Sequence, residues 1–330
     1  MLSCALAKTV VFEPKIHSNV FSASKSPVLR IQPGDTVDTK TWDAVGQDQK
    51  GVARVANPYT YPELRNALNG PFYVEGAAYG DTLEIHLDKV ALNRNWGYTT
   101  YRLIPSFLDP RTVENLYRNS FEKGAVRPER DNLVKWDLDL ASGMATARMP
   151  SASPAQLRFP VKPMLGCIGV APPGEESHSS GTSGAWGGNM DYNDVVEGAT
   201  LLLPVFHPGA YFFIGDGHAL QGDGEGLGMG IETSMDVRFT VKVRKNQRLS
   251  MPRLINDEYI ISIASQPEYN SNLDLALQRA NSDMISWLTS EYGFTPQQAH
   301  LLLGVAAQHK IVTYFGTVTT MIPRKFLPKK

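Results

Sequence analysis

Acidic side chains, one histidine and many glycines are concentrated in the segment 187–232. Within it Asp216 and His218 are two residues apart, and so are Asp223 and Glu225. Residues two apart face the same side of an extended strand, but the intervening glycines favour tight loops over a regular strand. Converging carboxylates repel one another unless a cation or a shared proton relieves the repulsion. The segment therefore indicates a divalent-metal centre with acid–base groups; solvated carboxylates in Gly–Asp turns are the alternative.

The start of the same segment, Gly187-Gly188-Asn189-Met190-Asp191, adds an amide and a carboxylate. An asparagine side chain offers both a donor and an acceptor, which suits an amide substrate or an oxyanion. A local turn stabilised by the Asn189 side chain is the alternative interpretation.

Four short motifs, GGNMD, LLPVFHPGA, GDGHALQGDGE and GMGIE, follow one another in this segment. In these motifs the chain resembles the acetamidase/formamidase family of amide hydrolases. The resemblance extends more thinly to PGDT (33–36), GPFYVEGAAYGDTLEI (70–85), GCIGVAPP (166–173) and the C-terminal helical segment. It implies a metal-dependent hydrolase that converts small linear amides, such as acetamide or formamide, into ammonia and a carboxylate.

The resemblance and the residue chemistry together predict a set of metal ligands. We expect Asp191 and His218 to bind the ion, with Asp223 as a third ligand and Glu232 as a ligand or as support for one. The chain has no closed Cys/His zinc pattern, so the metal itself is implied mainly by the resemblance. Zinc is the expected divalent metal, with calcium as the candidate for a second ion.

Catalysis and substrate binding are assigned to neighbouring positions. We expect Glu225 to act as the general base that takes a proton from water and returns it to the leaving amine. Asp223 is the second candidate catalytic carboxylate, and Asn189 with Gly188 is expected to contact the amide.

Two other functions remain open from the sequence. One is hydrolysis of a bulkier or different amide, because 175–186 is long and rich in Ser and Gly, and because Trp96, Tyr98 and Tyr101 could line a larger pocket. The other is a non-catalytic binding protein on the same scaffold. Metal content and ammonia release from a panel of amides would separate the three.

Other catalytic classes lack the residues they need. Cys167 lies in an apolar run typical of a buried small thiol, and there is no Gly-x-Ser-x-Gly motif. The serines of 177–185 have no lysine near them, and the glycine-rich 222–230 is acidic, so it would repel phosphate.

Composition restricts the partners. The 330 residues carry 32 Lys and Arg against 33 Asp and Glu, a net charge of −1, which gives no reason to expect nucleic acid or a membrane as partner. Two cysteines, Cys4 and Cys167, make no disulfide framework. We expect a small amide as the only ligand besides the metal, a homodimer or larger homo-oligomer, and a cytoplasmic location, or a periplasmic or secreted one if an N-terminal precursor segment has been removed.

Short alternating segments dominate, so the sequence predicts a β-rich α+β fold of mainly antiparallel strands with a late helical pair. We expect the helices at 271–292, which has one apolar stripe, and at 299–308, which Thr295 and Pro296 begin. Residues 109–121 and 63–68 are weaker helical candidates, and 177–185 is expected to be mobile. We place a boundary between an N-terminal β-rich part, 1–160, and a C-terminal α+β part, 161–330. The alternative is that the two parts form one intertwined unit. The predicted strands are 10–14, 27–31, 37–39, 72–75, 83–90, 133–140, 145–149, 164–170, 201–206, 236–243, 259–264 and 311–317.

Overall fold

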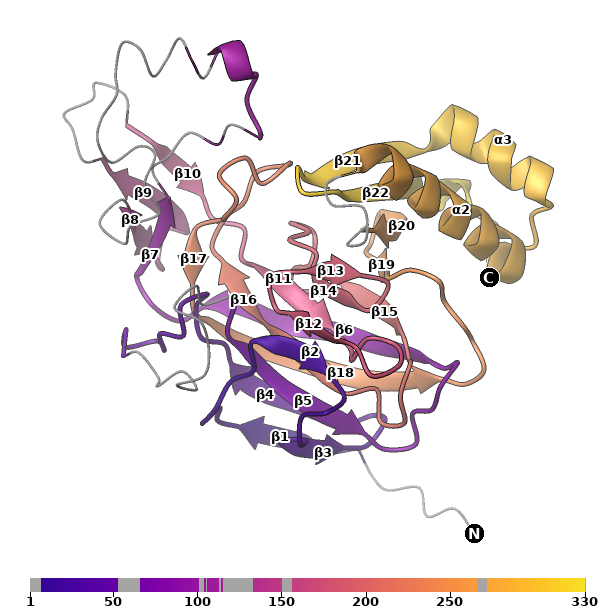
Figure 1. Cartoon of the computed structure of the whole chain (residues 1–330), viewed down its shortest axis with the longest axis horizontal. Coiled ribbons are helices and arrows are strands. Elements are labelled where there is room, and N and C mark those ends of the chain that lie inside the picture. The colour runs from indigo at the N-terminus through magenta and orange to yellow at the C-terminus, as the bar shows by residue number, and fades with distance from the viewer. Residues whose placement is uncertain are drawn as a thin grey trace.

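A computed structural model of the chain describes residues 7–52, 66–100, 104, 106–112, 114, 133–149, 156–265 and 272–329. It confirms the predicted fold class, because strands in two large sheets make up most of the regular secondary structure of the described chain and two helices follow late (Figure 1). All strand pairs are antiparallel except β1–β4 and β3–β5.

The first sheet has nine strands. Their spatial order is β1 (Thr9–Phe12), β4 (Thr36–Lys40), β18 (Met235–Arg244), β6 (Thr82–Leu92), β15 (Thr200–Pro204), β19 (Arg253–Ile255), β20 (Tyr259–Ala264), β22 (Thr317–Pro323) and β21 (Gln308–Thr313).

The spatial order of the second sheet is β10 (Arg158–Pro160), β9 (Met144–Arg148), β8 (Leu133–Asp139), β7 (Trp96–Thr100), β17 (Glu232–Thr233), β16 (Phe212–His218), β11 (Met164–Gly169), β14 (Gly187–Asn189) and β13 (Ser183–Gly184), with β5 (Leu68–Val74) joining β16 to β3 (Leu29–Ile31). This sheet contains β14, β16 and β17, three of the strands of the motif-rich segment 187–232. A small third sheet pairs β12 (Ser177–Ser179) with β2 (Val20–Ser22).

The two large sheets share one apolar core. Alternating residues of β18, among them Val237, Phe239 and Val241, are buried, which is the pattern of a strand with one face in a core. Across the sheets Phe239 meets Phe72 and Phe212 edge to face, with ring centroids 5.5 and 5.3 Å apart. Aromatic contacts of this kind add about 1 kcal/mol to the burial of the rings.

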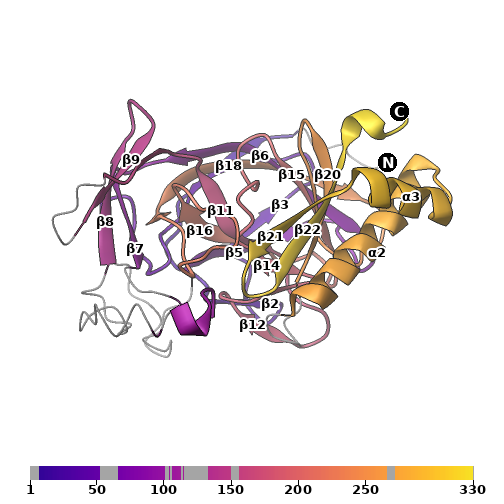
Figure 2. The same cartoon turned by 90° about the horizontal axis from the view of Figure 1, so that it is seen from above.

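The helix α2 (Leu273–Tyr292) packs on β20 and β22 of the first sheet, and α3 (Pro296–Ala306) packs on α2 and β22. Both helices lie on the opposite side of the molecule from the β8–β9 hairpin of the second sheet (Figures 1 and 2). Asn272 caps α2, and Thr295 and Gln298 form a capping box on α3, as the Thr-Pro start predicts. The buried residues of α2 include Met284 and Trp287, which belong to the predicted stripe. A short 3-10 turn, η3 (Arg324–Phe326), ends the described chain.

Several local predictions differ from the structure. The segment expected to be mobile contains β12 and β13, because His178 stacks on Trp186 and the backbone pairs with β2 and β14. The strand β7, which contains Trp96 and Tyr98, is not among the predicted strands. The predicted final strand is two strands, β21 and β22, because the chain turns at 314–316. Most of the helical candidates 109–121 and 63–68, and Tyr101, lie outside the described residues.

Strands from both sides of the proposed boundary at residue 160 alternate in both sheets. In the first sheet β6 lies between β18 and β15, and in the second β7 pairs with β17. Neither part therefore has a sheet of its own. Among the described helices, none combines the length and the apolar content that a membrane crossing requires.

Candidate functional site

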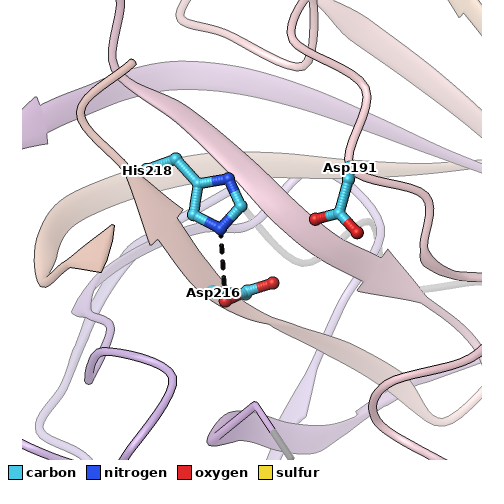
Figure 3. A group of neighbouring side chains, drawn as sticks. All are labelled: Asp191, Asp216 and His218. Carbon is cyan, nitrogen blue, oxygen red and sulfur yellow. Dashed lines mark ion pairs between the residues drawn. The ribbon is translucent and has the colours of Figure 1, made fainter. Parts of the chain in front are cut away.

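The end of β16 and the short strand β17 place three of the chemically important side chains together. His218 stands directly opposite Glu232 in the antiparallel register, and its Nε2 lies 3.1 Å from Glu232 Oε1. The same Nε2 lies 3.5 Å from Asp216 Oδ1 (Figure 3). Asp216 has φ +60°, a left-handed conformation that non-glycine residues seldom adopt and that is frequent at functional sites. The segment predicted to consist of loops is thus a strand here, with one irregular residue at the aspartate.

Asp191 reaches the same point from the turn after β14. Its backbone N–H donates to the carbonyl of Gly166 at 3.1 Å. A Cβ at Gly166 would collide with the carboxylates of both Asp191 and Asp216, so only glycine fits there. One potential ligand atom from each of Asp191, Asp216 and His218 lies within 4.8 Å of the other two. The fold therefore brings a nitrogen and two carboxylate oxygens to one point (Figure 3).

Gln221 fixes the orientation of the histidine ring. Its amide nitrogen donates to the backbone carbonyl of Asp191 at 2.6 Å, so its Oε1 faces His218 Nδ1 at 2.8 Å. The Nδ1–H must then be the donor, and Nε2 is turned toward the carboxylates. This is the arrangement that metal-binding histidines show, with one ring nitrogen held by a neighbouring acceptor.

A polar network supports the aspartates from the other side. Asn66 Nδ2 lies 2.8 Å from Asp216 Oδ2 and 2.5 Å from Asn189 Oδ1. Asn189 Nδ2 donates in turn to Asp191 Oδ2, and the buried Cys167 thiol lies 2.9 Å from Asn189 Oδ1. Asn189 thus holds a candidate ligand in place.

Glu225 comes from the glycine-rich loop 222–230, which is anchored to the β21–β22 hairpin. The Gly224 N–H donates to the Ile311 carbonyl, and the Tyr314 N–H donates to the Gly224 carbonyl at 2.8 Å. The Glu225 side chain is buried, and its Oε2 has no hydrogen-bond partner among the described residues.

These side chains line a cavity of about 360 Å³. Its wall also includes hydroxyl groups from β13, β22 and the ends of neighbouring strands, such as Ser183 and Thr317. No lysine or arginine lines it in the part of the chain that the structure describes. The carboxylates therefore lack a cationic partner other than the histidine.

Burial and neighbouring charges shift the pKa values of Asp191, His218, Glu225 and Glu232. Burial, with the charge of Asp216 added, raises the pKa of Asp191 to about 8. Burial also raises the pKa of Glu232 to about 7 and that of Glu225 well above its usual value. Burial alone would lower the pKa of His218, but the Glu232 and Asp216 carboxylates outweigh it and raise that pKa well above its usual value.

The residues fit a divalent cation. One oxygen on each of Asp191, Asp216, Glu225 and Glu232 is buried without a hydrogen bond from the described residues. A buried carboxylate oxygen without a donor is costly, and a metal ion relieves that cost. Nitrogen and carboxylate oxygen are ligands that zinc accepts, three from the protein being typical of a catalytic site.

The structure brings together most of the predicted site residues. Asp191, His218, Glu225 and Glu232 converge, and Asn189 lines the cavity. Asp223 does not join them, because its side chain is 59% exposed and pairs with Lys310 and Asn193 at 3.2 and 2.8 Å. The adjacent Gly224 and Glu225 turn inward while Asp223 turns outward.

Gly188 has a structural part in the site. Its φ is +97°, and a Cβ there would collide with the Thr182 carbonyl and crowd the Trp186 indole nitrogen. It is buried in β14 and does not line the cavity.

Four residues of the site were not among the predicted site residues: Asp216, Gln221, Asn66 and Gly166. The spacing of Asp216 to His218 is a usable signal, because two residues apart on a strand means one face. Gln221 is three residues beyond the histidine, and outside a helix this spacing does not place two side chains on the same face. Asn66 and Gly166 come from distant segments, and only the fold shows their part.

The sequence profile of the Acetamidase/Formamidase family matches residues 6–183 and 178–326. A provisionally named formamidase of Schizosaccharomyces pombe is 26% identical over 259 residues, 66% of this chain; the match spans 61% of the relative's length. An acetamidase structure from Bacillus halodurans has a TM-score of 0.76 at 27% identity, covering 96% of this chain and 98% of that one. An acetamidase structure from Yersinia enterocolitica has a TM-score of 0.77 at 28% identity, covering 97% and 94%.

Proposed function

The chain belongs to the acetamidase/formamidase family, and from that premise we propose that it is a metal-dependent hydrolase of small linear amides. Support comes from the names of the relatives, acetamidase and formamidase, and from the convergence of a histidine and four buried carboxylates. That convergence is the observation that carries the proposal, since carboxylates gathered without a lysine or arginine in the described cavity wall need a cation.

Asp191, Asp216 and His218 would hold the ion, with Glu232 beside them. A divalent cation bound there lowers the pKa of water, polarises the amide carbonyl and offsets the repulsion of the carboxylates. Zinc is the metal that we propose, because a neutral imidazole nitrogen with carboxylate oxygens is a common zinc set. Gln221 holds the imidazole by its Nδ1, so Nε2 faces the carboxylates and would be available to bind the ion.

In the reaction a C–O bond forms between the amide carbon and the oxygen of water, and the C–N bond breaks. Glu225 takes one proton from the water and delivers it to the nitrogen, so a carboxylic acid and ammonia result. Its raised pKa and its free Oε2 inside the cavity suit a group that must both accept and release a proton. Near neutral pH the products ionise to a carboxylate and ammonium.

The experiment compares the Glu225→Gln variant with the wild type and with Asp223→Asn, a change at an exposed carboxylate of the same loop. Each protein is purified, its metal content is measured by elemental analysis, and ammonia release from acetamide and formamide is followed. We expect Glu225→Gln to retain its metal and to lose activity by about 10²-fold or more. Asp223→Asn should behave as the wild type.

Two results would overturn the proposal. Unchanged turnover in Glu225→Gln would remove Glu225 from the chemistry. A wild-type protein that takes up no divalent metal and releases no ammonia would instead favour a binding protein on this scaffold.

A further inference from the structure

A second cavity, of about 460 Å³, lies beside the first. Its wall is almost entirely apolar. The main side chains are Phe107, Leu108, Trp136, Phe159, Leu220 and Leu227. Three of them remain far from buried: Phe107 is 46% exposed, Phe159 41% and Leu227 40%. Apolar and aromatic walls with few polar groups are typical of cavities that bind small organic ligands.

The glycine-rich loop 222–230 forms part of the wall of both cavities. Glu225 and Met229 line both cavities. A Cβ at Gly226 would collide with the Phe107 ring, and one at Gly230 would lie 2.6 Å from the imidazole of His218. Glycine at these two positions lets an aromatic ring approach the loop on one face while the histidine approaches it on the other. The apolar cavity therefore begins at the candidate catalytic carboxylate itself.

The stoichiometry of the reaction decides which part of a substrate could enter it. A primary amide releases only ammonia on its nitrogen side, so any additional atoms belong to the acyl group. Acetamide has few atoms, whereas cavities of about 300–1,000 Å³ enclose much larger ligands. Neither cavity is scaled to acetamide alone.

We propose that the second cavity is an acyl pocket and that the preferred substrates are primary amides with a large apolar, chiefly aromatic, acyl group. The proposal rests on amide hydrolysis at the neighbouring centre. With the carbonyl beside Glu225, the acyl chain passes Met229 and places its ring against Trp136 and Phe159. Those two rings have centroids 6.3 Å apart with their planes inclined by 39°.

The first test compares kcat/KM for acetamide, hexanamide, phenylacetamide and 3-phenylpropanamide on the metal-loaded protein, by ammonia release. Filling an apolar pocket raises kcat/KM by roughly 10-fold or more. We therefore expect at least one phenyl amide to exceed acetamide by about that factor. Acetamide cleavage with no preference for the larger amides would overturn the acyl pocket and leave the proposed function intact.

The second test fills the pocket with a side chain. Gly222 lines the second cavity and not the first, and a Cβ there meets no atom within 4 Å, so Gly222→Phe adds a ring at the cavity wall without a clash at its Cβ. We expect the ratio of phenyl-amide to acetamide kcat/KM to fall about 10-fold or more. Gly304→Phe is the matched control, since a Cβ at this glycine of α3 also meets nothing within 4 Å, and it should leave the ratio unchanged. An unchanged ratio in Gly222→Phe counts against the pocket.

Two further measurements test the pocket even if Gly222→Phe does not fold: a variant in the edge strand β10 and a binding experiment. Phe159→Ala removes an exposed ring of the pocket and should also lower the ratio. Calorimetric binding of phenylacetate, the acid product, should be about 10-fold tighter than binding of acetate, and Gly222→Phe should abolish that difference. If no amide is cleaved, the proposed function fails, while equal binding of the two acids refutes the pocket on its own.

Discussion

In the metal-free protein we expect the free energy of unfolding to fall as the pH rises toward neutrality. A carboxyl group whose pKa is higher in the folded than in the unfolded chain retains its proton longer when folded. Stability then falls as pH rises between the two pKa values. Burial raises the pKa of Asp191 to about 8 and that of Glu232 to about 7, so both have this sign.

The pH window and the magnitude follow from these values. Unfolded carboxyl groups titrate near pH 4, so the window opens at about pH 4.5 and closes near pH 7 for Glu232 and near pH 8 for Asp191. Each proton retained only by the folded state costs about 1.4 kcal/mol per pH unit. Between pH 5 and pH 7 one such group therefore lowers the free energy of unfolding by about 3 kcal/mol. The raised pKa of His218 acts in the same direction at higher pH: the stabilisation from its charged form is complete below about pH 6.5 and is lost as pH passes the folded pKa.

Urea unfolding of the chelator-treated protein at pH 5, 6 and 7 measures this effect. We expect the free energy of unfolding to decrease by several kcal/mol across the range, and the slope to flatten in the Asp191→Asn, Glu232→Gln double variant. Saturating zinc should reverse the slope, because the ligands must be deprotonated to bind. A metal-free wild type whose stability is constant or rising from pH 5 to pH 7, with a slope equal to that of the double variant, would refute the electrostatic account of the site.

Three further expectations concern single residues. Asp216→Asn should reduce zinc affinity at least about 10-fold in a competition titration, whereas Asp223→Asn should not change it, because only the first carboxylate lies at the candidate centre. Gly166→Ala should lose metal binding while retaining a native circular dichroism spectrum, since its methyl group would displace the carboxylates that lie over it. Arg94→Met should lower the free energy of unfolding by about 3–5 kcal/mol in urea, because it breaks a buried 2.8 Å ion pair and leaves Asp43 uncompensated.

Local patterns in the sequence were sufficient for some of the elements. The alternation of apolar and polar residues in 236–243 predicts β18, and the apolar stripe of 271–292 with Thr295-Pro296 predicts both helices. These signals are reliable because the period at which residues are buried is set by the geometry of a single strand or helix and does not depend on distant segments. The same density of acid, histidine and glycine marks the segment from which Asp191, His218, Glu225 and Glu232 converge on one cavity.

Only the tertiary structure decided which of those acids meet. Asp216 and Asp223 are both flanked by glycines, yet one points at His218 and the other pairs with Lys310 at the surface. The difference arises because Asp216 belongs to a strand between β11 and β17, while Asp223 belongs to a loop whose anchoring to β21 turns it outward. No short pattern records such long-range pairing.

Chemistry that depends on neighbouring residues along the chain could thus be predicted from this sequence: a β-rich hydrolase with a cluster of potential ligands between 187 and 232. Chemistry that depends on close approach of distant segments could not. The space over Gly166, the support from Asn66 and the apolar cavity beside Glu225 exist only because two sheets and a loop pack against one another. This packing joins residues that the sequence separates by as many as 150 positions.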